Sequence, residues 1–405
     1  MHHARLIGAA ALLVAASSCS RSHPTTANGC DASIKVPDGF CATLVTEAVG
    51  RGRHLAVRAN GDIFVARLGS RRDSGGIATV RGASVVNFWS GPVHGLAMAS
   101  DSTLYASTAH EILRFRFKGD SVAPRKGVDT IVAGLPGGAI PSNTIILDRN
   151  GSLIVGIPAP ATSCEKRNPC PVLATAAGIW RFDTGKRNQK PTDGTRIATG
   201  LRAPLALAVN PRDTAIYAVT HGPDSLHEHY PQIDATVAAT HPGDEMVRVS
   251  SIKADYGWPY CYYDVIAGTR VQSPEYGGDG RTPGSCDRLI RPVMSFPAHW
   301  EPMAMVFSNS QKLPEKYRDG AFVAFHGSSH RAPLPEDGYA VAFVPFRHGV
   351  PSMNFEVFAD GFAGAMKSAT GARSRPAGLA LGPDGSLYVS DDKGGRIWRI
   401  TYKGK

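Results

Sequence analysis

One motif recurs along the chain: two short runs of alternating apolar residues separated by a polar turn. The last copy reads RPAGLALGPDGSLYVSDD, from Arg375 to Asp392, and its Asp-Gly turn is typical of a β-hairpin. Five other segments have the same form, at residues 53–67, 94–108, 143–157, 203–220 and 301–326. Strand-like runs such as GIWRFDT and RIWRITY lie between the copies. Repeats made only of antiparallel strands, here six, predict an all-β fold, a six-bladed β-propeller.

The propeller is expected to occupy residues 35–405, preceded by a polar tether at residues 20–34. The 44 glycines and 29 prolines agree with many turns and therefore many short strands. CATLVTEAV, residues 41–49, is predicted to form the strand that closes the ring with the last blade. A β-sandwich is the alternative, but the sixfold recurrence of one hairpin favours the propeller.

Residues 1–19 have the features of a signal peptide for export. Arg5 precedes an apolar stretch, residues 6–16, which is too short to span a bilayer. Small residues then lead to Cys19, as in a bacterial lipoprotein signal, although Ala16 stands where such signals usually have leucine. An ordinary signal peptide is the alternative. We therefore expect an exported, periplasmic protein that contacts the membrane only through a lipid on Cys19.

The cysteine count agrees with lipidation, because removing Cys19 leaves six cysteines in three local pairs. In an exported protein such pairs predict disulfides. The expected bonds are Cys30–Cys41, Cys164–Cys170 and Cys261–Cys286. Zinc binding by CEKRNPC is the alternative for one pair, but neither a His-x-x-x-His nor a second close cysteine pair completes such a site.

The formal net charge of +10 raises the question of an anionic partner. The chain has no Lys/Arg run and no nucleic-acid motif, so nucleic acid is not the expected partner. In a propeller the residue before the first strand of each blade lies at the rim of the central channel, where ligands bind. The residues at or near this position are Arg53, His94, Asn143, Ala203, Glu301 and Arg375. An inward arginine cluster for an anion and a simple solvated basic surface are both open.

Several of these segments resemble the glucose/sorbosone dehydrogenase family. They include PDGFCATLVTEAV, RHLAVRANGDIFVA, HGLAM, YGWPYC, FVAFHGSSHR, GYAVAFVPF and RPAGLALGPDGSLYVSDD. The resemblance spans nearly all of the mature chain, and YGWPYC with HGSSHR is its most specific part. It implies a soluble quinoprotein that uses pyrroloquinoline quinone (PQQ) and calcium. Such an enzyme oxidises a CH–OH group of an aldose or related sugar and passes the electrons to a periplasmic acceptor.

The resemblance also implies positions for the cofactor site. Gly222 and Pro223 in THGPDS match backbone carbonyl ligands of calcium, which prefers oxygen. PQQ carries three carboxylates, which arginine forks pair with well. The matching or channel-facing arginines are Arg53, Arg202, Arg331, Arg373 and Arg375. Arg373 and Arg375, two apart on an extended segment, are expected to point the same way.

One departure from the family concerns catalysis. The family has a histidine base just before the third blade, and the corresponding residue here is Ile140. A general base typically contributes about 10²–10⁴ in rate, so its loss would slow oxidation. His94 and His221 are the candidate substitutes, and His326 and His330 are weaker ones. Each lone histidine could instead be structural.

Two other functions remain as alternatives. A propeller that kept the arginine cradle without a base would be a non-catalytic or weakly active binding module. A calcium lactonase would need several inward Glu, Asp and Asn side chains as metal ligands, and only Glu301 and Asn143 stand at suitable positions.

Overall fold

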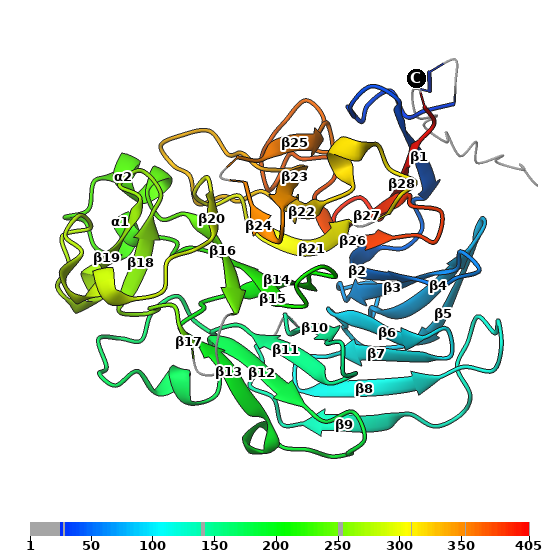
Figure 1. Cartoon of the computed structure of the whole chain (residues 1–405), viewed down its shortest axis with the longest axis horizontal. Helices are drawn as coiled ribbons and strands as arrows, with labels where there is room; N and C mark the ends of the chain where they lie inside the picture. The colour runs from blue at the N-terminus through cyan, green and yellow to red at the C-terminus, as the bar shows by residue number, and fades with distance from the viewer. Residues whose placement is uncertain are drawn as a thin grey trace, which may run out of the picture.

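The computed structural model describes residues 25–26, 29–138, 142–249, 254–308, 310–352 and 354–404. Six sheets of four or five strands are arranged around a common centre, as Figure 1 shows. Each of the six predicted hairpins forms the first two strands of one sheet. The prediction of a six-bladed β-propeller is therefore confirmed.

The strands of each blade follow one another from the centre outward. Blade 1 contains β2 (Arg51–Val57), β3 (Ile63–Leu68), β4 (Gly76–Arg81) and β5 (Ser84–Trp89). Blade 2 contains β6 (Leu96–Ser100), β7 (Thr103–Ser107), β8 (Glu111–Arg116) and β9 (Asp129–Ala133). Blade 3 contains β10 (Thr144–Leu147), β11 (Leu153–Ile157), β12 (Gly178–Phe182), β13 (Thr195–Thr199) and β17 (Ala254–Asp255).

The remaining blades are built in the same way. Blade 4 contains β14 (Pro204–Val209), β15 (Ile216–Thr220), β16 (Asp244–Val249) and β20 (Met294–Phe296). Blade 5 contains β21 (Pro302–Ser308), β22 (Gly320–Phe325), β23 (Ala340–Arg347), β24 (Val350–Pro351) and β25 (Glu356–Ala359). Blade 6 contains β26 (Pro376–Leu381), β27 (Leu387–Asp391), β28 (Ile397–Tyr402) and β1 (Phe40–Thr46).

The first strands of the blades form a closed inner ring. Consecutive members of the series β2, β6, β10, β14, β21 and β26 contact each other, and β26 contacts β2. The ring is completed by β1, which pairs antiparallel with β28 from Phe40 opposite Tyr402 onward. This is the closing strand that the sequence predicts. Because it comes from the start of the chain, the two ends of the propeller are joined by a hydrogen-bond ladder.

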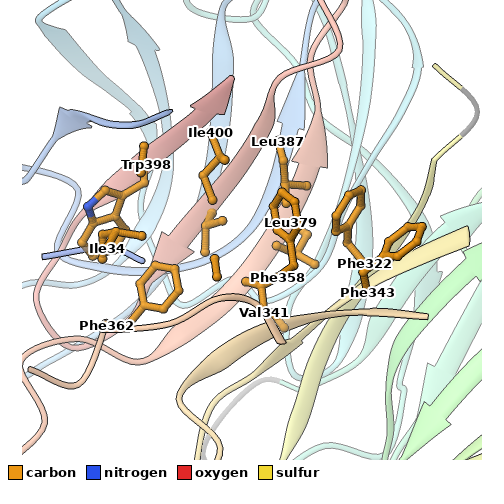
Figure 2. Close-up of a cluster of buried hydrophobic side chains, with 14 of the residues drawn as sticks. Ile34, Phe322, Val341, Phe343, Phe358, Phe362, Leu379, Leu387, Trp398 and Ile400 are labelled. Atoms are coloured by element: carbon orange, nitrogen blue, oxygen red, sulfur yellow. The ribbon is translucent and has the colours of Figure 1, made fainter. Parts of the chain in front are cut away.

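The apolar side chains pack mainly between neighbouring blades. Figure 2 shows the cluster between blades 5 and 6, where Trp398, Phe362 and Ile34 lie at one end and Phe322 and Phe343 at the other. Trp398 is fully buried, its ring centroid is 5.1 Å from that of Phe362, and its indole N–H donates to a carboxylate oxygen of Asp31 at 3.1 Å. These contacts fix the segment before β1 against the last blade.

A small lobe interrupts blade 4. It contains α1 (Leu226–His229), α2 (Ala235–Thr240), β18 (Cys261–Asp264) and β19 (Thr269–Gln272). In Figure 1 these elements lie together at the left, outside the ring of blades. None of the described helices is long and apolar enough to cross a membrane.

The three predicted cysteine pairs are bonded in the structure. The Cα atoms of Cys30 and Cys41 are 5.3 Å apart, and this bond ties the N-terminal segment to β1. The other two bonds are Cys164–Cys170, in the loop after β11, and Cys261–Cys286, in the lobe.

Candidate functional site

Charged side chains lie together at one end of the inner ring, and they come from two kinds of position. One kind precedes a first strand, as predicted, and includes Glu301 and Arg375. The other follows a second strand: Asp392 comes directly after β27, and His326 directly after β22. Because the two strands of a hairpin are antiparallel, the residue before the first and the residue after the second lie side by side. We call this end of the inner ring the channel mouth.

A chain of ion pairs joins the neighbouring blades 1, 6 and 5 at the channel mouth. A guanidinium nitrogen of Arg53 lies 2.9 Å from Asp392 Oδ2, and Asp392 Oδ1 lies 2.7 Å from His326 Nε2. His326 Nδ1 is 3.3 Å from Glu301 Oε2, which is also 3.3 Å from Arg375 Nη2. Two arginines, two carboxylates and one imidazole therefore share one partly buried network.

The carboxylates of this network are held in the charged form. Burial alone would raise the pKa of Glu301, but the hydrogen bond from His326 and the charges of His326, His221 and Arg375 lower it to about 2. Burial acts the same way on Asp392, and there the charges of Arg53 and His326 also outweigh it and lower the pKa. The negative charges therefore persist at neutral pH beside any bound ligand.

The turn that presents Glu301 is strained and is held by Asp244. Glu301 has a φ of 56°, in the left-handed region that side chains other than glycine rarely adopt. The buried carboxylate of Asp244 accepts the backbone N–H groups of Trp300 and Glu301 at 2.9 and 3.0 Å. Its other oxygen accepts the N–H of Gly222 at 3.1 Å. Burial raises the pKa of Asp244 to about 8. Asp244 thus joins the Glu301 turn to the predicted Gly222–Pro223 segment.

The Gly222–Pro223 segment has the features of a cation site made of backbone oxygens. Within the described chain, no backbone or side-chain donor is bonded to the carbonyl oxygen of Gly222 or Pro223. Beside them, a guanidinium nitrogen of Arg202 lies 2.5 Å from Asp224 Oδ1. Among the described residues there is no cluster of three or more His, Cys, Asp or Glu side chains that could hold a metal ion. A cation here would therefore depend on the backbone carbonyls and on a ligand.

The two candidate histidines differ in what they can reach. His221 is half-buried, and its Nε2 lies 2.9 Å from the carbonyl oxygen of Pro302, which can only accept a hydrogen bond. Nε2 therefore carries the proton and Nδ1 the lone pair. No other described group binds the His221 ring. Burial lowers the pKa of His221 to about 4, so the ring is neutral at pH 7 and Nδ1 is able to accept a proton.

His94, in contrast, is a structural residue in this fold. It is fully buried, its Nε2 contacts the hydroxyl of Thr144 at 3.4 Å, and its Nδ1 has no partner among the described residues. Its ring packs against His54 with 4.7 Å between the centroids. Burial, helped by the nearby His54 and Arg53, lowers its pKa well below the ordinary value. A side chain without exposed surface does not touch a substrate in the channel.

Two predicted cofactor contacts have other partners in the structure. Arg373 does not face the same way as Arg375: its guanidinium donates to the hydroxyl of Ser33 at 3.0 Å, whereas that of Arg375 binds Glu301 and the carbonyls of His326 and Gly327. The expectation assumed an extended segment, but the chain bends at Arg373.

Arg331 donates to the carbonyl oxygens of Ala298 and Pro335, at 2.7 and 3.2 Å. Its guanidinium therefore braces two loop segments.

Other predicted positions lie outside the described residues. These are Ile140, Cys19 and the signal segment 1–19, together with residues 20–24 and 27–28 of the tether. Asn143 is described, and its amide donates to the backbone carbonyls of Thr108 and Ala109.

The sequence analysis identified Glu301 but not the other carboxylates of the site. Asp392 directly follows β27, but its partner His326 is 66 residues away. Asp224 lies inside the THGPDS motif, and Asp244 begins β16, where a buried carboxylate is unexpected. The place of a residue in its hairpin could have identified two of these side chains, because Asp392 and His326 both directly follow the second strand of a hairpin.

Acid should destabilise the fold at a pH where carboxylates of ordinary pKa are still charged. Burial lowers the pKa of His54 to about 4, against about 6.5 in the unfolded chain, and that of His94 moves the same way. The unfolded state therefore binds protons that the folded state excludes, and stability falls as the pH drops below about 6.5. For His54 alone the loss is about 3 kcal/mol by pH 4.

Urea unfolding at pH 7, 5.5 and 4.5 measures this loss, since most of the decline from His54 falls above the range in which carboxylates titrate. His54→Gln should flatten the dependence, because glutamine keeps a donor for Met303 but does not titrate. The difference between the two proteins isolates His54, because the raised pKa of Asp244 acts in the opposite direction in both. The same pH dependence in His54→Gln and in the unmutated protein would contradict a buried neutral His54.

Comparison with known proteins places the whole propeller in one group. The family model described as TrAA12-like matches residues 34–403. A structure of carbohydrate-active enzyme family AA12 from Trichoderma reesei superposes with a TM-score of 0.76 at 20% identity, covering 91% of this chain and 97% of that one. The PQQ domain of pyranose dehydrogenase from Coprinopsis cinerea gives a TM-score of 0.73 at 17% identity, again covering 91% and 97%.

A curated relative, an uncharacterized protein of Borreliella burgdorferi, is 26% identical over 209 residues. That match covers 51% of this chain and 48% of the relative, so the chain spans about half the length of the protein it matches.

Proposed function

The chain belongs to the TrAA12-like family, and from this membership and the channel mouth we propose that it is a PQQ- and calcium-dependent oxidoreductase of sugars. The resemblance to sugar dehydrogenase propellers that the sequence motifs suggested is confirmed at the level of family and fold. The observation on which the proposal depends is the set of basic side chains at the channel mouth whose buried N–H groups have no protein acceptor.

The arginines at the channel mouth fit an anionic cofactor in part. Within the described residues, the buried Nε atoms of Arg53 and Arg202 have no hydrogen-bond partner. A buried donor without an acceptor is costly, so a ligand carboxylate there would satisfy groups that the protein leaves open. Arg375 already binds three acceptors, and Arg373 and Arg331 bind groups elsewhere. We therefore assign the cradle to Arg53 and Arg202, with Arg375 as a neighbour.

A cation fits beside this cradle. The open carbonyl oxygens of Gly222 and Pro223 match the preference of calcium for oxygen ligands, and the charges of Asp224 and Glu301 lie nearby. When bound, PQQ supplies the two-electron oxidant for the sugar, and calcium polarises its carbonyl group.

The base in this proposal is His221. Its Nδ1 lone pair is open, and the bond from Nε2 to Pro302 fixes the ring. It accepts the proton of the sugar hydroxyl while a hydride leaves the carbon that bears this hydroxyl. The negative charge of Glu301 acts on His221 and stabilises the imidazolium that results. This assigns the role that Ile140 is unable to fill, and His94 is too buried to fill it.

The proposal also covers the cellular location of the enzyme, its anchoring and its electron acceptor. We propose that the protein is exported to the periplasm, that a lipid on Cys19 anchors it there, and that a periplasmic acceptor reoxidises the cofactor. The signal-like residues 1–19 and the three disulfides support this location.

Arg202→Ala should weaken PQQ binding by roughly ten- to a hundredfold, because a charge-assisted hydrogen bond is worth about 1.5–3 kcal/mol. Calorimetric titration of the purified protein with PQQ in the presence of calcium measures this. The matched control is Arg212→Ala, in the turn at the opposite end of the same hairpin, where the side chain is 50% exposed and pairs with Asp319.

If the unmutated protein binds no PQQ, the family-based mechanism fails. If it binds PQQ but reduces no dye with any aldose, the binding-module alternative replaces the enzyme.

A further inference from the structure

A pocket lies at the edge of the lobe. Its volume is about 480 Å³, within the range of small-molecule sites. It lies between the lobe hairpin β18–β19, the 3₁₀ turn Gly284–Arg288 and the loop that contains Asn168. None of the residues that the sequence analysis or the proposed mechanism assigns to cofactor or substrate lines it.

Two tyrosine rings form the apolar part of the pocket. The ring centroids of Tyr260 and Tyr276 are 4.7 Å apart, and the planes are inclined by 54°. Tyr260 Oη accepts the N–H of Cys170 at 2.8 Å, and the hydroxyl of Tyr276 donates to the carbonyl of Arg167 at 3.0 Å. Both rings are therefore fixed before any ligand arrives.

Polar groups with open hydrogen-bonding capacity surround these rings. Gln272 donates through Nε2 to the carbonyl of Tyr276 at 2.6 Å, which leaves its side-chain oxygen as an acceptor. Asp255 accepts the N–H of Gly257 with one carboxylate oxygen, and the other is not bonded to the described chain. Asn168 and Ser285 are exposed at the rim.

The walls of the pocket are cross-linked. Cys261 and Cys286 line it and are bonded to each other, and the bond between Cys164 and Cys170 closes the loop that both tyrosines hold. A site with covalently restrained walls loses little conformational freedom on binding.

We propose that this pocket is a second carbohydrate-binding site, which takes a neutral sugar ring independently of the channel mouth. No lysine or arginine lines it and Asp255 does, so a phosphate or sugar acid is disfavoured. The inclined rings do not form the parallel slot that a flat nucleobase needs. A pyranose has apolar C–H faces for the tyrosines and equatorial hydroxyls for Gln272, Asp255 and Asn168.

Calorimetric titration of the purified protein with cellobiose, maltose and adenosine, in the absence of PQQ, tests this proposal. Saturable binding of at least one disaccharide and none of adenosine is expected. Tyr276→Ala should reduce the affinity about tenfold or more, whereas Tyr276→Phe, which keeps the ring, should retain it. Because Tyr276→Ala could loosen the loop, Ser285→Trp is the second variant. Ser285 is exposed, so the added ring should block the pocket without disturbing the fold.

Arg202→Ala and His221→Asn separate this site from the proposed catalytic site. Disaccharide binding that survives both variants but not Ser285→Trp supports the pocket, whether or not PQQ binds at the channel mouth. Binding that is lost in either channel variant and kept in Ser285→Trp overturns the proposal. So does the absence of saturable disaccharide binding, or adenosine binding that Ser285→Trp abolishes.

Discussion

Aldose oxidation by the PQQ-loaded protein should fall by about 10²–10⁴-fold when His221 is replaced by asparagine, because the reaction loses its general base. Asparagine ends short of the position of His221 Nε2, so the bond to the carbonyl of Pro302 is lost together with the base. The affinity for PQQ therefore has to be measured beside turnover, because it shows whether the backbone around Gly222 and Pro223 stays in place. Dye reduction under saturating cofactor measures turnover, and calorimetry with PQQ measures cofactor binding. The expected result is a large loss of turnover with a much smaller change in PQQ affinity.

His348→Asn is the matched control for His221→Asn. His348 lies in the exposed turn between β23 and β24 with a φ of 52°, a conformation that asparagine adopts readily. Its replacement should leave turnover unchanged. Turnover that survives His221→Asn would show that the base lies elsewhere. A parallel loss of PQQ binding would instead show that His221 holds the cofactor site together.

Trp398→Ala should lower the free energy of unfolding by about 3–5 kcal/mol, the usual loss for a fully buried tryptophan. The change removes the ring that packs on Phe362 and the N–H that donates to Asp31, and both contacts lie beside β1. Urea unfolding at constant pH measures the loss. We expect the folded variant to keep its disulfide between Cys30 and Cys41.

The control for Trp398→Ala is Trp89→Ala. Trp89 ends β5, the outermost strand of blade 1, where its ring is half-buried and packs on Phe115. A smaller loss of stability is expected there. Equal losses of unfolding free energy in the two variants would mean that the junction between blades 5 and 6 contributes no more to stability than the outer strand of blade 1.

The propeller could be predicted because its signals are local. Alternating apolar residues and turn residues specify five of the six hairpins over fewer than 20 positions, as in the Pro-Asp-Gly turn where Gly385 has a φ of 81°. The lobe was not predicted, because its short elements are separated by irregular loops without a repeating pattern. Its two helices span only Leu226–His229 and Ala235–Thr240, which is too short for a clear apolar periodicity.

The candidate site was predicted in part: rim positions pointed to several arginines and to Glu301, but not to Asp224, Asp244 and Asp392. Arginines at rim positions suggested an anionic ligand, and Arg53, Arg202 and Arg375 do lie at the channel mouth. The carboxylate partners of Arg53 and Arg375 come from other blades, so no spacing along the chain links them. Asp224, the partner of Arg202, belongs to the same blade. The choice between His94 and His221 also required the fold, because it depends on burial and on which ring nitrogen the backbone occupies.

The pairing of β1 with β28 also sets the order in which the molecule can be finished. A chain made from its N-terminus contains β1 before any blade, but the partner strand, Ile397–Tyr402, follows the first strands of all six blades. Until it is made, the open edges of β1 and of blade 6 are available to other strands or to proteases. Chains that stop before β28 never close the ring and keep those edges. Closure of the ring therefore reports that translation has passed Tyr402.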